Sequence, residues 1–288
     1  RVLRHENRVG DADRANFSGA TLAGAEMTEL SAFAADFSDC VLMGAKLGRA
    51  NLKDANLSGA LLEGADIGGA NLEGANLSGA DLSGVDVSAA RTSGANLSGI
   101  LSKPSAETIK LAIAFLEQAK NHHSWCRSGG KEGAAAKLDG ADLRPLGDAL
   151  KGCRLSAISA VGACLVGLDL TGAHLQGANL EGADLRGACL KDADLRGARL
   201  ARANLTRADL RGVVLGPLPL GPDRAAPANL GAARLRYVAA QSADLTKAVL
   251  DGADLSGADV TGARMKGASL RDADLATVVG LEEAYTRA

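Results

Sequence analysis

Apolar side chains return at every fifth position along most of this chain. Within residues 45–82, Leu52, Leu57 and Leu62 each follow an Ala two positions earlier, and the residues between them are mostly small or polar. A helix advances about 100° per residue, so a five-residue period would scatter these leucines over all of its faces. A strand has a period of two, which would place Leu52 and Leu57 on opposite faces. The pattern therefore predicts a chain that turns once in every five residues and directs each Ala and Leu into a shared interior.

The repeated unit, A(D/N)LxG, resembles that of the pentapeptide-repeat family. Residues 55–84 contain it as ANLSG, ANLEG and ADLSG, and related units recur along most of the chain. The resemblance implies an all-β fold, a right-handed, four-sided parallel β-helix in which four pentapeptides form one coil. Leu and Ala would fill its interior. Because each coil of such a solenoid contacts only its neighbours, the predicted core is long rather than globular.

The register of the repeat divides the chain into five parts. We predict an N-terminal lead-in or cap at 1–14, a first β-helix at 15–100, a helical insertion and loop at 101–135, a second β-helix at 136–280, and a C-terminal tail or cap at 281–288. The register is lost after Ile100 and is different by Leu155, which indicates two β-helical segments. Phe17 and Phe37 are 20 residues apart, so a coil of four pentapeptides would stack them in the core.

Residues 102–121 carry the signals of one amphipathic helix. Ser and Pro stand at its start, and Ile109, Ala112, Ile113 and Leu116 follow at helical spacing. The next stretch, HHSWCRSGGKEG at 122–133, is interpreted as a loop. A helix, then His and Trp, then a Gly-rich turn resembles the segment that precedes the first coil in many pentapeptide-repeat proteins, which implies that a second module starts in mid-chain.

A proline-rich interruption lies within the second β-helix. Residues 216–227 hold four of the six prolines, and Leu230 resumes in the register of Leu215. Because proline removes donors from a β ladder, we predict a loop that leaves one corner of a continuing solenoid.

The two β-helical segments differ in charge. Residues 15–100 hold ten acidic and four basic side chains, whereas residues 153–215 hold six acidic and eight basic ones. Lys191 and Arg211 are 20 residues apart and are predicted to stack on one face. The candidate interaction surface comprises Arg186, Lys191, Arg196, Arg211, Pro217, Pro219, Pro222 and Trp125. Either it docks an acidic partner or a second copy, or it is a solvated face of the repeat.

No catalytic or metal motif stands out from the repeat. His122, His123 and Cys126 form the one metal-like cluster, but structural zinc sites have four ligands at defined spacings, and no CxxC or HxxxH accompanies them. We interpret this cluster as helix capping and packing of Trp125. The many Asp and Gly residues follow from the repeat itself, so we predict no enzyme activity, no cofactor and no metal.

Two functions are consistent with these patterns. The first is a non-catalytic scaffold that presents β-helical faces and loops to an unidentified protein partner, with homo-oligomerisation through open coil ends as an additional option. The alternative comes from the resemblance: family members that protect DNA gyrase and topoisomerase IV from quinolones are acidic mimics of duplex DNA. This alternative would make the chain a modulator of type II topoisomerase. The net charge of −2 argues against direct nucleic-acid binding.

Cysteine placement bears on localisation. Cys40 and Cys153 stand at the Ala position and are predicted to be buried, whereas Cys164 and Cys189 precede a Leu and are predicted to face outward. An odd, scattered set of five thiols offers no disulfide framework and suits a reducing cytoplasm. The chain contains no run of 18 apolar residues, so the sequence predicts no transmembrane segment. The chain begins at Arg1 rather than Met, which is compatible with an N-terminal targeting segment that has been removed.

Overall fold

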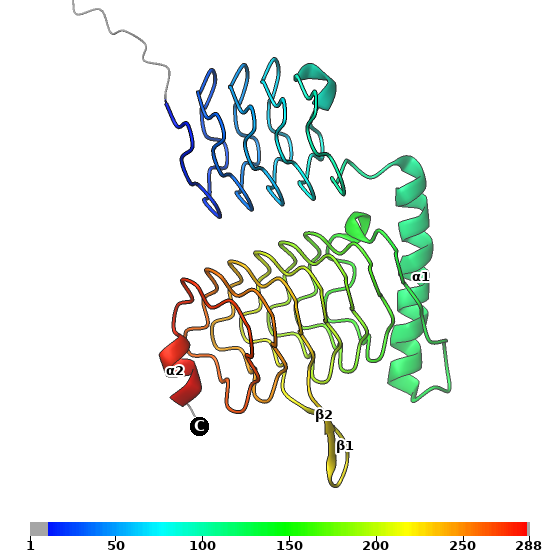
Figure 1. Ribbon diagram of the computed structural model, residues 1–288. Coiled ribbons are helices and arrows are strands. Elements are labelled where there is room, and N and C mark those ends of the chain that lie inside the picture. Colours follow the sequence, from blue (N-terminus) through cyan, green and yellow to red (C-terminus); the bar gives the residue numbers. More distant parts are fainter. Residues whose placement is uncertain (1–10, 287–288) are drawn as a thin grey trace, which may run out of the picture. The chain divides into compact units, whose positions relative to one another are not determined.

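The chain forms two compact units, Arg1–Pro104 and Ser105–Ala288. The computed structural model describes residues 11–286 (Figure 1). Each unit is a solenoid of successive coils with its own buried interior.

The first unit is built from parallel bridges between residues 20 apart. The bridges run from Asp11↔Ser31 to Asp81↔Leu101. Twenty residues are four pentapeptides, so each coil contains four repeats. Coiling begins at Asp11, four residues before the predicted start, and the rest of the predicted lead-in, residues 1–10, lies outside the described residues. A short 3₁₀-helix, η1 (Val87–Ala89), interrupts the last coil.

Each pentapeptide makes one turn, and the turn explains the residues of the repeat. In the unit that begins at Ala173, the carbonyl of Leu175 accepts from the N–H of Ala178. Gly177 lies between them at φ +64°, a left-handed conformation that suits Gly in a type II turn. The Asp or Asn position caps the same turn: the Asp169 carboxylate accepts from the N–H of Thr171, two residues later.

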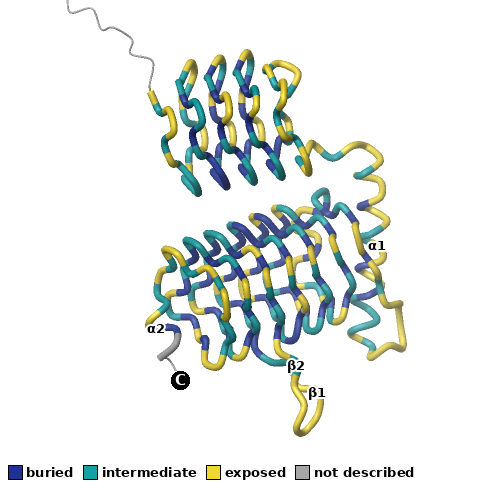
Figure 2. The backbone as a smooth tube through the Cα atoms, viewed as in Figure 1, coloured by how far each residue is buried: buried dark blue, intermediate teal, exposed yellow. Residues whose placement is uncertain are grey.

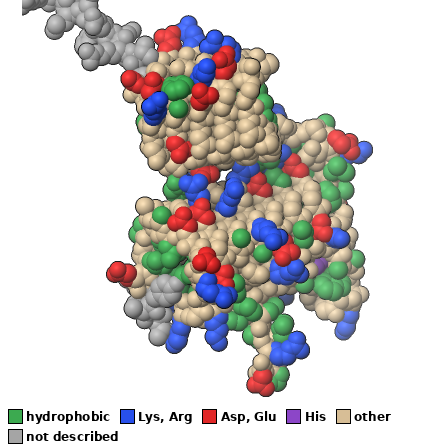
Figure 3. Space-filling view, viewed as in Figure 1, with side chains coloured by type: hydrophobic (Ala, Val, Ile, Leu, Met, Phe, Trp, Pro, Cys, Tyr) green, Lys and Arg blue, Asp and Glu red, His purple; other side chains and the backbone are tan. Residues whose placement is uncertain are grey.

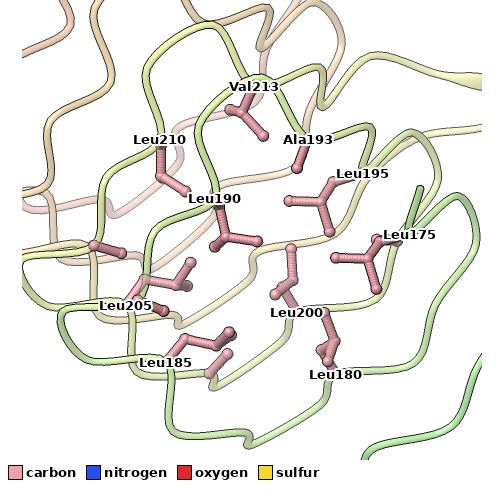
Figure 4. Packing of buried hydrophobic residues seen from close by; sticks show 14 of the residues in the cluster. Leu175, Leu180, Leu185, Leu190, Ala193, Leu195, Leu200, Leu205, Leu210 and Val213 are labelled. Carbon is pink, nitrogen blue, oxygen red and sulfur yellow. The ribbon is translucent and has the colours of Figure 1, made fainter. Parts of the chain in front are cut away.

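Apolar side chains stack inside the coils at the predicted spacing. The rings of Phe17 and Phe37 are stacked with their centroids 4.9 Å apart, as predicted. In the second unit Leu175 lies beside Leu195, and successive coils repeat this arrangement (Figure 4). The inward-facing positions are buried in the middle coils of each unit, whereas several of those in the end coils are only half-buried (Figure 2).

The cysteines follow the register with one exception. Cys40 is fully buried, as its Ala position predicts, but Cys153 is only half-buried, so its predicted burial is wrong. Cys153 belongs to the first coil of the second unit and packs against the edge of its core. Cys164 and Cys189 are also half-buried, and burial raises the pKa of the Cys164 thiol to about 11.

Helix α1 (Ala106–Ser128) opens the second unit. The Ser105 side chain caps its first turn, and Gly129 ends it at φ +64°. The helix therefore extends seven residues beyond the predicted end, through residues that we interpreted as a loop. Its packed face agrees with the prediction only in part. Ala112 is buried and Leu116 packs against the core, as predicted, but Ile109 and Ile113 are exposed, and Ala119 and His122 are buried instead.

The second solenoid continues across an inserted hairpin. After the 3₁₀-helix η2 (Arg144–Leu146), the bridge spacing settles at 20 residues, as in Arg154↔His174. It increases to 30 at Arg199↔Asn229 and the bridges beside it, and then returns to 20. The ten extra residues form an antiparallel hairpin of β1 (Leu218–Gly221) and β2 (Arg224–Ala226), and helix α2 (Leu281–Thr286) follows the last coil.

Candidate functional site

A groove of about 640 Å³ opens in the second unit between the end of α1, one face of the coil, and the hairpin β1–β2. Its lining combines aromatic, basic and small side chains. The lining residues are Trp125, Cys126, Gly129, Gly130, Arg154, Ser156, Ala157, His174, Gln176, Arg196 and Leu218. We refer to this region as the hairpin groove.

Two histidines hold α1 against the first coil. The His122 ring bonds at both nitrogens, with Nε2 3.0 Å from the Ser156 carbonyl and Nδ1 3.0 Å from the backbone N–H of Ala136. Nδ1 of His123 accepts from the backbone N–H of Arg154 at 2.9 Å. These backbone groups belong to the first coils of the second unit, so the two rings take the place of a preceding coil. One wall of the groove is fixed in this way.

The opposite wall depends on two glycines beneath the hairpin. A Cβ at Gly197 would lie 2.7 Å from Cβ of Leu218 and 3.2 Å from the carbonyl oxygen of Ala226, and one at Gly177 would touch Leu218 at 3.6 Å. The base of the hairpin therefore rests directly on the backbone of the coil. Hydrophobic, basic and acidic side chains lie on the projecting hairpin (Figure 3).

We expect Gly197→Ala to lift the hairpin from the coil, because the added methyl group would overlap Leu218. Gly187→Ala is the matched control. Gly187 has φ +62°, close to the +65° of Gly197, but a Cβ there meets nothing within 4 Å. Both variants carry a left-handed Ala at about 1 kcal/mol. Trypsin should cleave after Arg224 several-fold faster in Gly197→Ala than in Gly187→Ala, and equal rates would contradict the contact.

Hydrogen bonds join the side chains on the floor of the groove. The Ser156 hydroxyl donates to Oε1 of Gln176 at 2.6 Å, and Nε2 of Gln176 donates to the Asp194 carboxylate at 2.7 Å. Arg196 binds the same carboxylate through Nε and Nη2. Burial alone would raise the pKa of Asp194, but the bonds from Arg196 and Gln176 outweigh it and lower the pKa. The floor is thus a fixed polar network that spans three coils.

Pairing with a local Asp recurs at other predicted surface residues. Arg186 binds Asp184 and Arg211 binds Asp209, each Asp being two residues earlier in the sequence. Hydrogen bonds from Arg211 lower the pKa of Asp209. Arg186 is only 4% exposed, unlike the outward-facing cation that we predicted. These arginines therefore do not add free positive charge to the surface.

The predicted surface residues do not form one surface but are spread over several regions of the second unit. Trp125 and Arg196 line the hairpin groove, and Pro217 lines an adjoining hollow of about 290 Å³ that also includes Arg196, Arg264 and Lys266. Pro219 and Pro222 are exposed on the hairpin. Within the 20-residue coil, Lys191 and Arg211 are one pentapeptide away from the position of Arg196, so they lie on a different face of the solenoid. Arg186 is two pentapeptides away from Arg196 and lies on a third face.

Sequence reasoning missed Arg154, His174 and Leu218 at the groove. Arg154 and His174 form one bridge pair, and they occupy the position where the repeat usually has Asp or Asn. The replacement of Asp or Asn at these two positions could have indicated, from the sequence alone, that this face of the solenoid differs from the others. Nothing in the sequence indicated where Leu218 would lie, because its contact with Gly197 depends on the direction in which the hairpin folds.

The groove shows no metal-binding geometry in the described part of the chain. Among residues 11–286, no group of three or more His, Cys, Asp or Glu side chains is arranged to hold an ion. Both ring nitrogens of His122 are already used, and Cys126 lies 3.7 Å from the carbonyl oxygen of Ser156. Burial raises the pKa of the Cys126 thiol, so it stays protonated at neutral pH.

Among residues 11–286, no helix has the length and apolar character needed to cross a membrane.

Solved structures of pentapeptide repeat proteins resemble this chain. HetL from the cyanobacterium Nostoc sp. strain PCC 7120, involved in heterocyst differentiation regulation, is 26% identical over 94% of this chain and 90% of its own, with a TM-score of 0.28. AT2G44920 from the Arabidopsis thaliana thylakoid lumen is 28% identical over 43% and 63%, with a TM-score of 0.25. QnrB1, a plasmid-mediated fluoroquinolone resistance protein, is 16% identical over 88% and 85%, with a TM-score of 0.25.

These TM-scores are below 0.5, so the three structures do not indicate what the hairpin groove binds. No curated protein matches the chain. The family model of pentapeptide repeats matches in eight copies, at residues 34–59, 55–99, 153–192, 163–202, 178–216 and 228–267, which together make up more than half of the chain. With the 20-residue bridge spacing and the turn in every fifth residue, this match confirms the predicted resemblance: the chain belongs to the pentapeptide-repeat family.

Proposed function

We propose that this chain is a non-catalytic scaffold that binds a protein partner at the hairpin groove. The observation that carries the proposal is that an inserted hairpin and the end of α1, each anchored to the coil, flank a single groove. A rigid coil between two anchored walls provides a preorganised surface, which reduces the entropy lost on binding. The groove residues favour binding over catalysis, because the Ser156 hydroxyl is bonded to Gln176 and the Cys126 thiol is held protonated.

The family membership supports a finer description of the coil. We propose that the four pentapeptides of each coil form the four sides of a right-handed β-helix, as the resemblance implies. The stacked faces would then present residues 20 apart as straight ladders. An experimental structure with coils of the opposite hand would contradict this assignment.

Photo-crosslinking tests the scaffold proposal. A photoreactive residue is introduced at His174, which lines the groove and is exposed, and separately at Lys191, which is exposed on another face. We expect illumination in cells to join one partner to the His174 derivative and not to the Lys191 derivative. Replacing residues 217–227 with a short Gly-Ser linker should reduce the yield. Equal labelling from both positions, or no product from either, would contradict the proposal.

The mass of the crosslinked product identifies self-association. A homo-oligomer would give a product of twice the 29.1 kDa chain, whereas a different partner would give another mass.

The alternative hypothesis, modulation of DNA gyrase, rests on the acidic balance of residues 15–100. A supercoiling assay with and without a quinolone tests it, and the absence of protection or inhibition at micromolar protein would reject it.

Free thiols support a reducing compartment, and we propose the cytoplasm. All five cysteines are free, and they lie among the described residues. Free cysteines of this number are unusual in oxidising compartments. Labelling of intact cells with a membrane-impermeant maleimide should leave the protein unmodified until the cells are opened, and labelling before opening would contradict the assignment.

A further inference from the structure

The hairpin groove presents hydrogen-bond donors that have no partner within the described part of the chain. The side chain of Arg154 is exposed, and only its backbone N–H is bonded, to His123. The indole N–H of Trp125 also bonds to none of the described residues, although the ring is half-buried between His122 and Gly130. A guanidinium that lines a groove and an unpaired indole N–H both favour a ligand with acceptor oxygens.

The amide and carboxylate acceptors on the floor of the groove are already occupied. Oε1 of Gln176 accepts from Ser156, and the Asp194 oxygens accept from Gln176 and Arg196. The backbone oxygen of Ser156 is bonded to His122. A ligand that donates to these acceptors would therefore have to break this network, whereas a carboxylate can bind at Arg154 without breaking it. The groove is complementary to negative charge.

Apolar surface lies next to these donors. Trp125 and Leu218 line the groove from opposite walls, with Ala157 also in the lining. The volume of about 640 Å³ lies within the range of about 300 to 1,000 Å³ that is typical of ligand sites. An apolar side chain between Trp125 and Leu218 would remove both surfaces from water.

The adjoining hollow favours an extended ligand over a single small anion. Arg196 lines both spaces, so a chain segment that fills the groove can continue along the base of the hairpin. Lys266 lines the hollow, is exposed, and has no ion pair among the described residues. Asp244, the carboxylate in the hollow, is already bound by Arg264. A second site that favours negative charge therefore lies beyond the first.

We propose that the hairpin groove binds an acidic segment of a partner protein, with a carboxylate at Arg154 and a neighbouring apolar side chain between Trp125 and Leu218. This inference rests on the proposed scaffold function and names the chemistry of its partner. Arg154 would bind the carboxylate bidentately, which gives the contact both direction and strength. Lys266 would attract a further acidic residue of the same segment.

Trp125 provides a direct assay, because it is the single Trp of the chain. The probe is a blocked synthetic octapeptide of alternating Glu and Leu, compared with peptides that have Gln or Lys in place of Glu. We expect the Glu peptide to change the fluorescence of Trp125 saturably, the Gln peptide to bind at least about tenfold more weakly, and the Lys peptide to give no response. Affinity for the Glu peptide should fall with added salt.

Substitutions at Arg154 test the assigned contact. Arg154→Gln keeps the backbone bond to His123 and should weaken binding of the Glu peptide about tenfold. Arg154→Glu should reverse the preference in favour of the Lys peptide. Arg202→Gln is the matched control, because Arg202 is exposed, lies outside the groove, and undergoes the same change of charge. Thermal melting of each variant establishes that it is folded.

Three results would overturn the inference. Equal binding of the Glu and Gln peptides would remove the role of charge, and undiminished binding by Arg154→Gln would remove the role of that residue. Free glutamate that binds as tightly as the peptide would indicate a small-anion site. The crosslinking experiment separates this inference from the scaffold proposal. A partner captured at His174 through a segment without acidic residues would leave the scaffold standing and reject the carboxylate.

Discussion

Leu185→Asp should unfold the coils in the middle of the second unit. Leu185 is fully buried, and it packs among other leucines of the core, including Leu205 (Figure 4). The substitution removes about 1.5 to 3 kcal/mol of apolar burial. It also places a carboxylate where no polar partner exists, at a cost of several kcal/mol. The sum is comparable with the total stability of an ordinary domain, about 5 to 15 kcal/mol.

Hydrogen exchange followed by mass spectrometry locates the damage. Each coil is stabilised by its two neighbours, so protection should be lost first in the coils that contain residues 165–205. Lys191→Asp is the matched control, because this residue lies in a neighbouring repeat but is exposed. It should change the free energy of unfolding by less than about 0.5 kcal/mol. A Leu185→Asp protein with an unchanged melting curve would show that the interior register is wrong.

The interior of the coils could be predicted because it depends on a local rule that the chain repeats. Once the five-residue period is recognised, residues 20 apart must stack, and the contact of Phe17 with Phe37 follows from the spacing alone. The same rule predicts that Leu185 is buried. Because the same contact recurs in successive coils, one irregular position such as Cys153 does not obscure the pattern.

Helix α1 was harder to predict because tertiary contacts decide its length and its packed face. His122 and His123, followed by two glycines, are typical of a loop, but their rings bond to the backbone of Ser156 and Arg154, more than 30 residues away. The predicted packed face included Ala112 and Leu116, which do pack against the core, but also Ile109 and Ile113, which are exposed. The helix lies on the coil through Ala112 and Ala119, because small side chains permit close approach.

The distribution of charge on the surface was predictable only in part. Arg186, Arg196 and Arg211 look like a basic patch in a count of charges, but each lies two residues after an Asp whose carboxylate binds it. This Asp-x-Arg spacing is visible in the sequence and could have been interpreted as pairing. Arg154 differs because it occupies the Asp position itself, and so its own repeat contains no carboxylate to bind it.

His122→Leu should destabilise the second unit by about 2 kcal/mol. The substitution fills the space of the ring but leaves the N–H of Ala136 without a partner and removes a donor from the Ser156 carbonyl. An unpaired, partly buried backbone group costs about 1 to 3 kcal/mol. For a unit of this size, the loss should lower the melting temperature by about 4 to 8 °C. His123→Ala is the control: its bond to Arg154 is exposed to water, so the loss should be below about 1 kcal/mol.

The pH dependence of stability distinguishes His122 from an ordinary packing residue. Its two bonds require a neutral ring that donates from Nε2 and accepts at Nδ1, and a second proton at Nδ1 would face the Ala136 N–H. Burial lowers the pKa of His122 below its ordinary value of 6.5, and it outweighs the bond to Ser156, which acts in the opposite direction.

Because the folded state binds this proton less readily than the unfolded chain, stability is complete above about pH 6.5 and falls as the pH drops toward the lowered pKa. The carboxylates with lowered pKa values, such as Asp169 at about 2, lose their contribution only below about pH 4, so the two windows separate. Urea unfolding between pH 5 and pH 8 should therefore show a slope in the unchanged protein that is reduced in His122→Leu and kept in His123→Ala. An equal slope in all three would mean that the ring does not hold α1 to the coil as a neutral bridge.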